Sequence, residues 1–276
     1  MIDREKLVEV VKQAYISACK RLPKRVKERL RDALLEEKEG LARLSLEVLL
    51  ENAELAEKEG LPLCQDTGVA VVWVKACEEF ELKGLKEAIN QGVALACKEG
   101  RLRASVCDPI TRKNTGNNTP AIIHFELVKE PVLEICVLPK GCGSENMSQI
   151  RMLSPAKGVE GIVDFVTEVV KSAGPNPCPP VSLGIGIGGD FETAALLSKK
   201  ALFRDPGTPH PDPEIANLEK RILERVNTLG IGPLGFGGKT TCLFVHIETH
   251  PCHIASLPVA VNVQCHCYRL EKVKVV

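Results

Sequence analysis

The N-terminal part of the chain has the pattern of amphipathic helices. Apolar residues between Leu7 and Ala18 recur at three- and four-residue spacing, which places them on one face of a helix. Pro23 opens a second segment of this kind and Gly40 precedes a third, in keeping with the preference of both residue types for helix ends. The pattern therefore predicts a helical N-terminal layer over residues 1–60.

From residue 69 onward the pattern changes to short runs of β-branched residues bounded by glycine or proline, which is typical of strands. The predicted strands cover residues 69–74, 121–127, 132–138, 181–187, 243–247 and 259–263. Helical patterns lie at residues 85–98, 159–171, 191–202 and 214–229. We therefore expect an α/β fold, with the helical layer followed by a mixed α/β body over residues 61–276, in a single domain of residues 1–276 with cofactor-binding loops. Strand order does not follow from the pattern.

Charge and hydropathy exclude several classes of partner. The chain has 276 residues, and its 36 Lys and Arg residues balance its 36 Asp and Glu residues, so no net field attracts nucleic acid or an anionic membrane. No apolar run approaches the roughly 18 residues that span a bilayer, and the N-terminus lacks the pattern of an export signal. We expect a cytoplasmic protein that binds neither nucleic acid nor membrane.

Twelve cysteines are many for this length, and in the cytoplasm they should stay reduced. Four of them fall within helical or strand patterns and are predicted core residues, namely Cys19, Cys77, Cys97 and Cys136. Four others lie in predicted loops, namely Cys64, Cys142, Cys178 and Cys265, and Cys142 and Cys178 stand directly beside glycine or proline. Because the sequence has no Cys-x-x-Cys pair, it lacks the signature of a structural zinc site, and any metal must be held by distant segments.

Two glycine-rich segments resemble nucleotide-binding motifs. The run Gly184–Gly189 follows a predicted strand, opens a helix and matches the dinucleotide fingerprint. That fingerprint requires a second strand after the helix, whereas here the Pro-rich segment 205–213 follows. We therefore favour a close approach of backbone to a helix or cofactor, and keep an NAD-dependent oxidoreductase as a remote alternative. The segment Gly230–Thr240 ends in Gly-Lys-Thr, but its spacing is too short for a phosphate-binding loop.

Six segments, taken together and in order, resemble the α subunit of class I fumarate hydratases, the iron–sulfur enzymes of the fumarase and L-tartrate dehydratase α family. The segments are Cys64–Gly68, Asn114–Pro120, Lys140–Met147, Cys178–Pro180, Gly237–Thr240 and His253–Pro258. The resemblance covers nearly the whole chain. The first and fourth segments are shared with L-tartrate dehydratase, whereas Gly-Ser-Glu-Asn-Met and His-Ile-Ala-Ser-Leu-Pro are more similar to fumarase.

The resemblance implies a [4Fe–4S] cluster held by three cysteines, which correspond to Cys64, Cys178 and Cys265. The fourth iron would then have no protein ligand and would act as a Lewis acid toward the substrate. Cys267 lies two residues past the third of these cysteines, so it is the alternative third ligand.

The resemblance also implies which residues line the substrate pocket. Gln65, Arg103 and the backbone at Gly143 would bind substrate, and Asp66 and His253 would carry the acid–base chemistry. Two of these positions have a simpler reading. Asp66 could instead fix a turn with its side chain, and Arg103 could lie on a solvated turn.

The implied reaction is the reversible hydration of fumarate to (S)-malate, with dehydration of L-tartrate as the alternative. Single-chain members of the family continue into a second domain, so we expect a separate β subunit that completes the active site around a small dicarboxylate. A non-catalytic cluster-scaffold subunit is a further alternative, suggested by the many cysteines.

Overall fold

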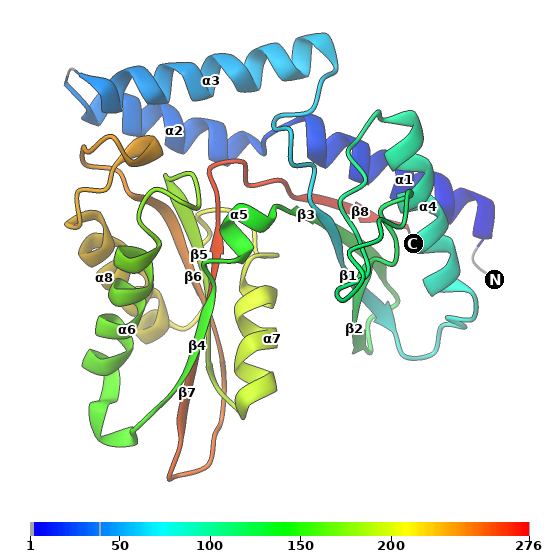
Figure 1. The fold of residues 1–276 in the computed structure, drawn as a ribbon. Helices are drawn as coiled ribbons and strands as arrows, with labels where there is room; N and C mark the ends of the chain where they lie inside the picture. Colours follow the sequence, from blue (N-terminus) through cyan, green and yellow to red (C-terminus); the bar gives the residue numbers. More distant parts are fainter. Residues whose placement is uncertain (1–2, 39, 276) are drawn as a thin grey trace. The chain divides into compact units, whose positions relative to one another are not determined.

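The computed structural model describes residues 3–38 and 40–275, and Met1, Ile2, Glu39 and Val276 lie outside that description. The chain divides into two compact units, each with its own sheet (Figure 1). Unit 1 comprises Met1–Pro23, Asn52–Cys142 and Arg269–Val276, and unit 2 comprises Lys24–Glu51 and Gly143–Tyr268. The expected single domain stays a prediction.

Unit 1 is a four-stranded sheet with two helices. Its elements are α1 (Arg4–Lys20), β1 (Val69–Cys77), α4 (Leu85–Glu99), β2 (Ile122–Val128), β3 (Leu133–Lys140) and β8 (Glu271–Lys274). The strand order is β2-β1-β3-β8. Strands β1 and β2 are parallel and are joined through α4, while the other neighbours are antiparallel. The mixed sheet agrees with the predicted α/β class.

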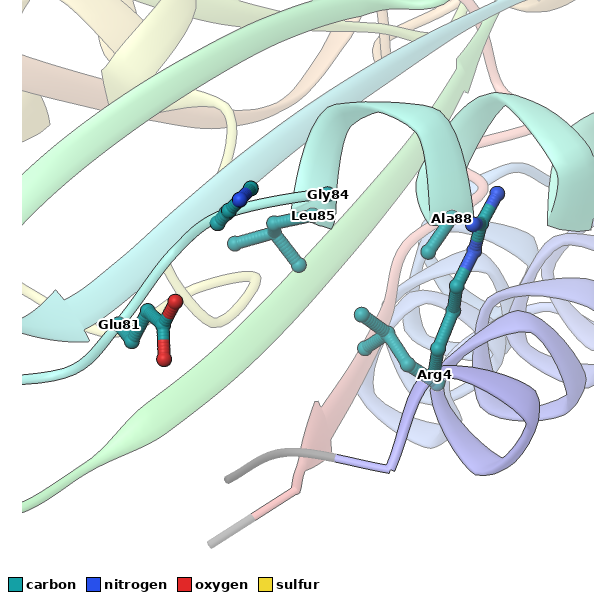
Figure 2. Close-up of a pocket in the computed structure, with 7 residues that line it drawn as sticks. Arg4, Glu81, Gly84, Leu85 and Ala88 are labelled. Atoms are coloured by element: carbon teal, nitrogen blue, oxygen red, sulfur yellow. The ribbon is translucent and has the colours of Figure 1, made fainter.

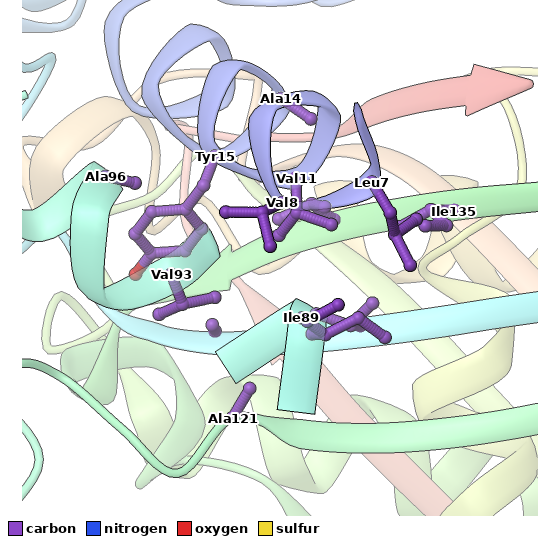
Figure 3. Close-up of a cluster of buried hydrophobic side chains, with 14 of the residues drawn as sticks. Leu7, Val8, Val11, Ala14, Tyr15, Ile89, Val93, Ala96, Ala121 and Ile135 are labelled. Atoms are coloured by element: carbon purple, nitrogen blue, oxygen red, sulfur yellow. The ribbon is translucent and has the colours of Figure 1, made fainter. Parts of the chain in front are cut away.

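The core of unit 1 forms where α1 and α4 pack on the sheet. Asp3 caps α1 by accepting a hydrogen bond from Glu5 N at 2.9 Å. The face of α1 that includes Val11 and Tyr15 is buried against Ile89 of α4 and the alternate residues of β1 that face the helices (Figure 3). The apolar residues that recur at helical spacing in the N-terminal sequence are therefore the residues that α1 buries in the core.

Unit 2 is a second four-stranded sheet with helices on both faces. Its elements are α2 (Lys24–Glu36), α5 (Cys142–Glu145), β4 (Gln149–Leu153), α6 (Gly158–Ala173), β5 (Val181–Gly188), α7 (Phe191–Ala201), α8 (Pro213–Asn227), β6 (Cys242–His250) and β7 (Leu257–Gln264), with short 3-10 turns at Pro155–Lys157 and Pro233–Gly235. Helix α5 begins on the last residue of unit 1, and α3 (Leu41–Glu59) begins in unit 2 and ends in unit 1. The strand order is β4-β7-β5-β6, with β5 parallel to β6 and antiparallel to β7.

The glycine-rich run of β5 serves helix packing. A Cβ atom on Gly184 would stand 2.2 Å from Ser198 O, and one on Gly186 would stand 2.0 Å from Ala194 O, so α7 lies directly on the strand backbone. The Asp190 carboxylate caps α7, at the helix end where a pyrophosphate would otherwise bind. The described stretch after α7 leads through the Pro-rich loop into α8 and contains no strand. These features explain the fingerprint without a dinucleotide.

The sequence pattern located every predicted helix and strand to within a few residues, and the α/β class is confirmed. Two strands were missed, β4 and β8, because β8 is largely polar, β4 is short and largely exposed, and neither has a buried apolar run. The four-residue helix α5 is too short to show a helical period. In the part of the chain that the structure describes, no helix combines the length and apolar character needed to cross a membrane.

Replacing Gly186 by alanine should destabilise unit 2 by about 2–3 kcal/mol, because the added methyl group forces α7 away from β5. Urea unfolding followed by circular dichroism measures the effect. The matched control is Gly143→Ala, whose Cβ would meet only Asn176 O at 3.7 Å. Equal midpoints for the two variants would contradict the packing role of the glycine.

Candidate active site

The loop Cys64–Gly68 in unit 1 is held by its own acidic side chain. Asp66 Oδ1 accepts from Gly68 N and Oδ2 accepts from Cys142 N, each at 2.9 Å. The Asp66 N–H in turn lies 3.4 Å from Cys64 Sγ, to which it donates. The carboxylate therefore fixes the turn and aims a backbone donor at the sulfur, which is the environment of a thiolate ligand. The turn role of Asp66 is confirmed, and its acid–base role stays a prediction.

Buried polar groups hold the same loop from inside. The Tyr15 hydroxyl lies 3.2 Å from Thr67 O and 3.1 Å from Gly68 O. The buried Asn118 amide donates to Gly68 O at 3.0 Å, while its oxygen accepts from Ser105 N at 2.8 Å. Asn118 thus ties the loop to the segment around residue 105, which gives the Asn-Thr-Gly-Asn-Asn motif a structural purpose.

Arg103 lies beside the loop. Thr67 Oγ1 donates to Arg103 O at 3.1 Å, and the Arg103 residue is exposed. Unit 1 therefore brings together Cys64, Gln65, Asp66 and Arg103, with the exposed Gln65 side-chain oxygen 3.3 Å from Cys64 Sγ. An exposed guanidinium at this position is able to bind a carboxylate.

Unit 2 brings Cys178 and Cys265 to one end of its sheet. Cys178 precedes β5 and Cys265 follows β7, and the antiparallel register pairs Ser182 with Gln264. His266 connects the two loops, since its N–H donates to Cys178 O at 3.3 Å and its Nδ1 lies 3.0 Å from the same oxygen. Cys178 is exposed and Cys265 is half-buried.

Exposure distinguishes Cys265 from Cys267. Cys267 is only 3% exposed, and its carbonyl oxygen accepts from Gln264 Nε2 at 3.0 Å. A buried thiol is less able to reach a cofactor than its half-buried neighbour. This difference in exposure favours Cys265 over Cys267 as the third ligand, and the assignment stays a prediction.

Gly143 lies with the Cys178 loop in unit 2. It is exposed, and the nearest atom to a Cβ built on it is Asn176 O at 3.7 Å. Asn176 precedes Cys178 by two residues. The exposed backbone at Gly143 is therefore near the second predicted ligand, and its substrate-binding role stays a prediction.

Within unit 2, His253 is not brought together with Cys178 and Cys265. It lies in the exposed loop between β6 and β7, where its Nδ1 accepts from Ala255 N at 3.1 Å. Cys265 lies past the other end of β7, an eight-residue strand of roughly 25 Å. The sequence already indicates that His253 and Cys265 lie far apart, since a predicted strand separates the two residues.

The Gly-Gly-Lys-Thr segment holds a carboxylate from the chain itself. Glu37 Oε1 accepts from Lys239 N at 2.5 Å and from Thr240 N at 3.3 Å, and Glu37 is buried. An acidic group already occupies the backbone donors that a phosphate would need. The structure therefore agrees with the expectation that this segment binds no phosphate.

The predicted core cysteines are confirmed, because Cys19, Cys77, Cys97 and Cys136 are all buried. Burial raises the pKa of Cys19 and of Cys242 to about 12 and also raises the pKa of Cys97, so these thiols resist the deprotonation that metal binding requires. Among the described residues, no three His, Cys, Asp or Glu side chains form a group that could hold a metal ion. The cluster and its ligands therefore stay predictions.

Sequence reasoning missed Arg269, which precedes β8. Its side chain is 1% exposed, and Nη1 donates to Asp66 O at 2.5 Å. The only available signal is a lone arginine between apolar residues, which a sequence alone cannot distinguish from a surface position.

A separate pocket in unit 1 lies at the N-terminal ends of α1 and α4. Figure 2 shows Arg4, Glu81, Gly84, Leu85 and Ala88 around it. Its lining includes none of the predicted site residues. It therefore has no connection with the cysteine loops.

Comparison with known proteins finds relatives over almost the whole chain. The family model described as Fumarate hydratase (Fumerase) matches residues 8–274. A protein of Methanocaldococcus jannaschii, provisionally named L(+)-tartrate dehydratase subunit alpha, is 45% identical over 268 residues, which are 94% of this chain and 94% of that protein. The L(+)-tartrate dehydratase subunit alpha of Escherichia coli strain K12 is 35% identical over 269 residues, which are 96% of this chain and 89% of that protein.

Thiol alkylation should separate the two classes of cysteine. In reduced, metal-free protein at about pH 8, iodoacetamide should modify the exposed Cys178 at least on the order of a thousandfold faster than Cys19 or Cys242, since a raised pKa keeps those two thiols protonated and burial hides them. Peptide mass spectrometry over time measures the rates. Modification of Cys19 at the rate of Cys178, without unfolding, would contradict the assigned burial.

Proposed function

Because the chain belongs to the fumarate hydratase (Fumerase) family, a family of hydro-lyases, we propose that it is the α subunit of an iron–sulfur enzyme that adds water to, or removes it from, C4 dicarboxylates. The observation that carries the proposal is the set of exposed or half-buried groups around Cys64 in unit 1. A thiol, an amide and a carboxylate are grouped there, namely those of Cys64, Gln65 and Asp66, and the exposed Arg103 adjoins the same loop through its backbone carbonyl oxygen.

A [4Fe–4S] cluster is the proposed cofactor, with Cys64, Cys178 and Cys265 as its ligands. Their chemistry fits the group, because all three lie in loops and none is buried, whereas Cys267 is buried and Cys19 has a raised pKa. A backbone N–H directed at Cys64 Sγ is a further feature that suits a cluster thiolate. When bound, the cluster supplies a Lewis-acidic iron without a protein ligand, which polarises the substrate hydroxyl.

The chain's own residues handle the dicarboxylate and its proton. Arg103 binds a substrate carboxylate, and Gln65 and the backbone N–H of Gly143 orient the substrate. Asp66 accepts or returns the proton on the carbon next to the carboxylate. Its two carboxylate oxygens accept from Gly68 N and Cys142 N, so the group has one orientation and little freedom to leave it.

His253 is the proposed partner of Asp66 in acid–base chemistry, and its position restricts how it acts. It lies at the opposite end of β7 from Cys265, roughly 25 Å along the strand. Within one copy of unit 2 the two residues therefore cannot share a pocket. We infer that His253 acts from a second copy of the chain, which its exposed loop is able to approach.

Fumarate and (S)-malate are the first proposed substrate pair. The Gly-Ser-Glu-Asn-Met and His-Ile-Ala-Ser-Leu-Pro segments, which resemble fumarase, support them. L-tartrate is the second candidate, supported by the names of the two relatives. One hydroxyl group separates tartrate from malate, so the choice depends on a few polar contacts in the pocket.

A separate β subunit is the proposed partner, since both relatives are named as alpha subunits. The active complex would then be an assembly of α and β chains. The test of function consequently uses the co-expressed complex.

The αβ complex, purified without oxygen, should hydrate fumarate or dehydrate L-tartrate, and air or iron chelation should abolish the activity. Cys64→Ser, Cys178→Ser and Cys265→Ser should each remove the cluster absorbance and lower activity at least about a hundredfold. Cys77→Ser, at a buried core position, is the control that should keep both. Full activity in aerated, iron-free complex would reject the proposal, and normal iron content in Cys265→Ser would move the third ligand to Cys267.

Subunit mixing tests the inferred role of His253. His253→Asn and Asp66→Asn complexes should each lose about a hundredfold or more in kcat with the cluster absorbance retained. Mixed and reassembled, they should regain up to about a quarter of wild-type activity, because half of the random pairs contain one intact site. If both residues act within one copy, mixing restores nothing.

A further inference from the structure

Arg269 is a buried cation in the interior of unit 1. It is 1% exposed and is among the largest side chains that are fully buried. Burying a guanidinium is costly unless hydrogen bonds and an opposite charge compensate it. Its position therefore calls for a specific anionic partner.

The atoms around Gly141 identify that partner. A Cβ atom on Gly141 would stand 3.0 Å from Arg269 Nη2 and 3.2 Å from Asp66 Oδ2. The guanidinium and the carboxylate therefore lie against the same face of one glycine, and Arg269 Nη1 also donates to Asp66 O at 2.5 Å. Arg269 thus contacts the main chain of Asp66 and approaches its side chain.

Two other ionisable groups near Arg269, Tyr15 and Cys19, do not supply a negative charge at neutral pH. Burial raises the pKa of Tyr15 well above its usual value and that of Cys19 to about 12, although Arg269 lowers both. Lys140, whose backbone packs against Gly68, is buried and basic. Asp66 is an acidic residue that Arg269 contacts, so its carboxylate is able to compensate the buried charge.

We propose that Arg269 is a positioning residue that holds the Asp66 carboxylate in the one orientation in which it accepts from the amides of Gly68 and Cys142. It acts through Asp66 and does not touch substrate. The inference rests on the proposed function for its catalytic consequence, since Asp66 moves a proton only in that reaction. Its structural consequence, an ordered carboxylate, is independent of any substrate.

Arg269→Lys keeps the charge but loses the planar guanidinium, whose Nη1 donates to Asp66 O and whose Nη2 lies on the same side of Gly141 as the Asp66 carboxylate. In the αβ complex it should lower kcat about 10–100-fold, leave KM within about threefold and keep the cluster absorbance. Gly141→Ala should give the same pattern with every hydrogen-bonding group retained, because its methyl group would stand 3.0 Å from Arg269 Nη2 and 3.2 Å from Asp66 Oδ2 and force one of them to move. This second variant keeps the test open if the first one folds poorly.

Arg204→Lys is the matched control. Arg204 is also largely buried, donates to the carbonyl oxygens of Ile247 and Thr208, and pairs with Glu219, but it belongs to unit 2. It should lower the melting temperature and leave kcat unchanged. A wild-type kcat in Arg269→Lys, or a loss of kcat in step with melting temperature in both arginine variants, would overturn the positioning role.

Amide hydrogen exchange separates this inference from the proposed function. In Arg269→Lys, the amides of Gly68 and Cys142 should exchange at least about tenfold faster, while core amides of β1 keep wild-type rates. Wild-type complex that is inactive on fumarate, malate and tartrate would reject the proposed function, and the exchange rates would still decide the role of Arg269. Unchanged exchange at both amides would overturn it.

Discussion

The Cys64–Gly68 loop has no helix or strand to satisfy its backbone, so its shape depends on hydrogen bonds from side chains. Tyr15 and Asn118 supply donors to its carbonyl groups from the core, and Asp66 accepts from amides on its outer side. Tyr15 of α1 links the core to the loop. Its ring packs among apolar core residues, and its hydroxyl donates to Gly68 O in the loop. A fixed loop is what a cluster ligand and a catalytic carboxylate both require.

In unit 2, the antiparallel pairing of β5 and β7 decides where the predicted site residues lie. Because β5 and β7 run antiparallel, the residue before one strand and the residue after the other arrive at the same end of the sheet. This brings Cys178 near Cys265 and sends His253 to the far end. The contact of His266 with Cys178 O then fixes the two loops to each other.

Two segments have sequences similar to nucleotide-binding motifs, and in both of them an acidic side chain of the protein accepts hydrogen bonds from the backbone N–H groups. Asp190 caps the helix after the glycine-rich run, and Glu37 accepts from the amides of the Gly-Lys-Thr segment. Converging backbone N–H groups attract an anion, and this attraction is what binds phosphate in nucleotide sites. Here the chain supplies its own anions, so the motifs stabilise the fold.

The sequence by itself determined the secondary structure and the nature of most cysteines, because apolar periodicity and neighbouring glycine or proline are local signals. It also carried the motifs that resemble fumarate hydratase, which the family comparison confirmed. Only the tertiary structure decided the strand order and the burial of Arg269 beside Asp66. Both depend on contacts between segments that are far apart in the sequence, from Val71 with Ile122 to Asp66 with Arg269, and no local pattern encodes such contacts.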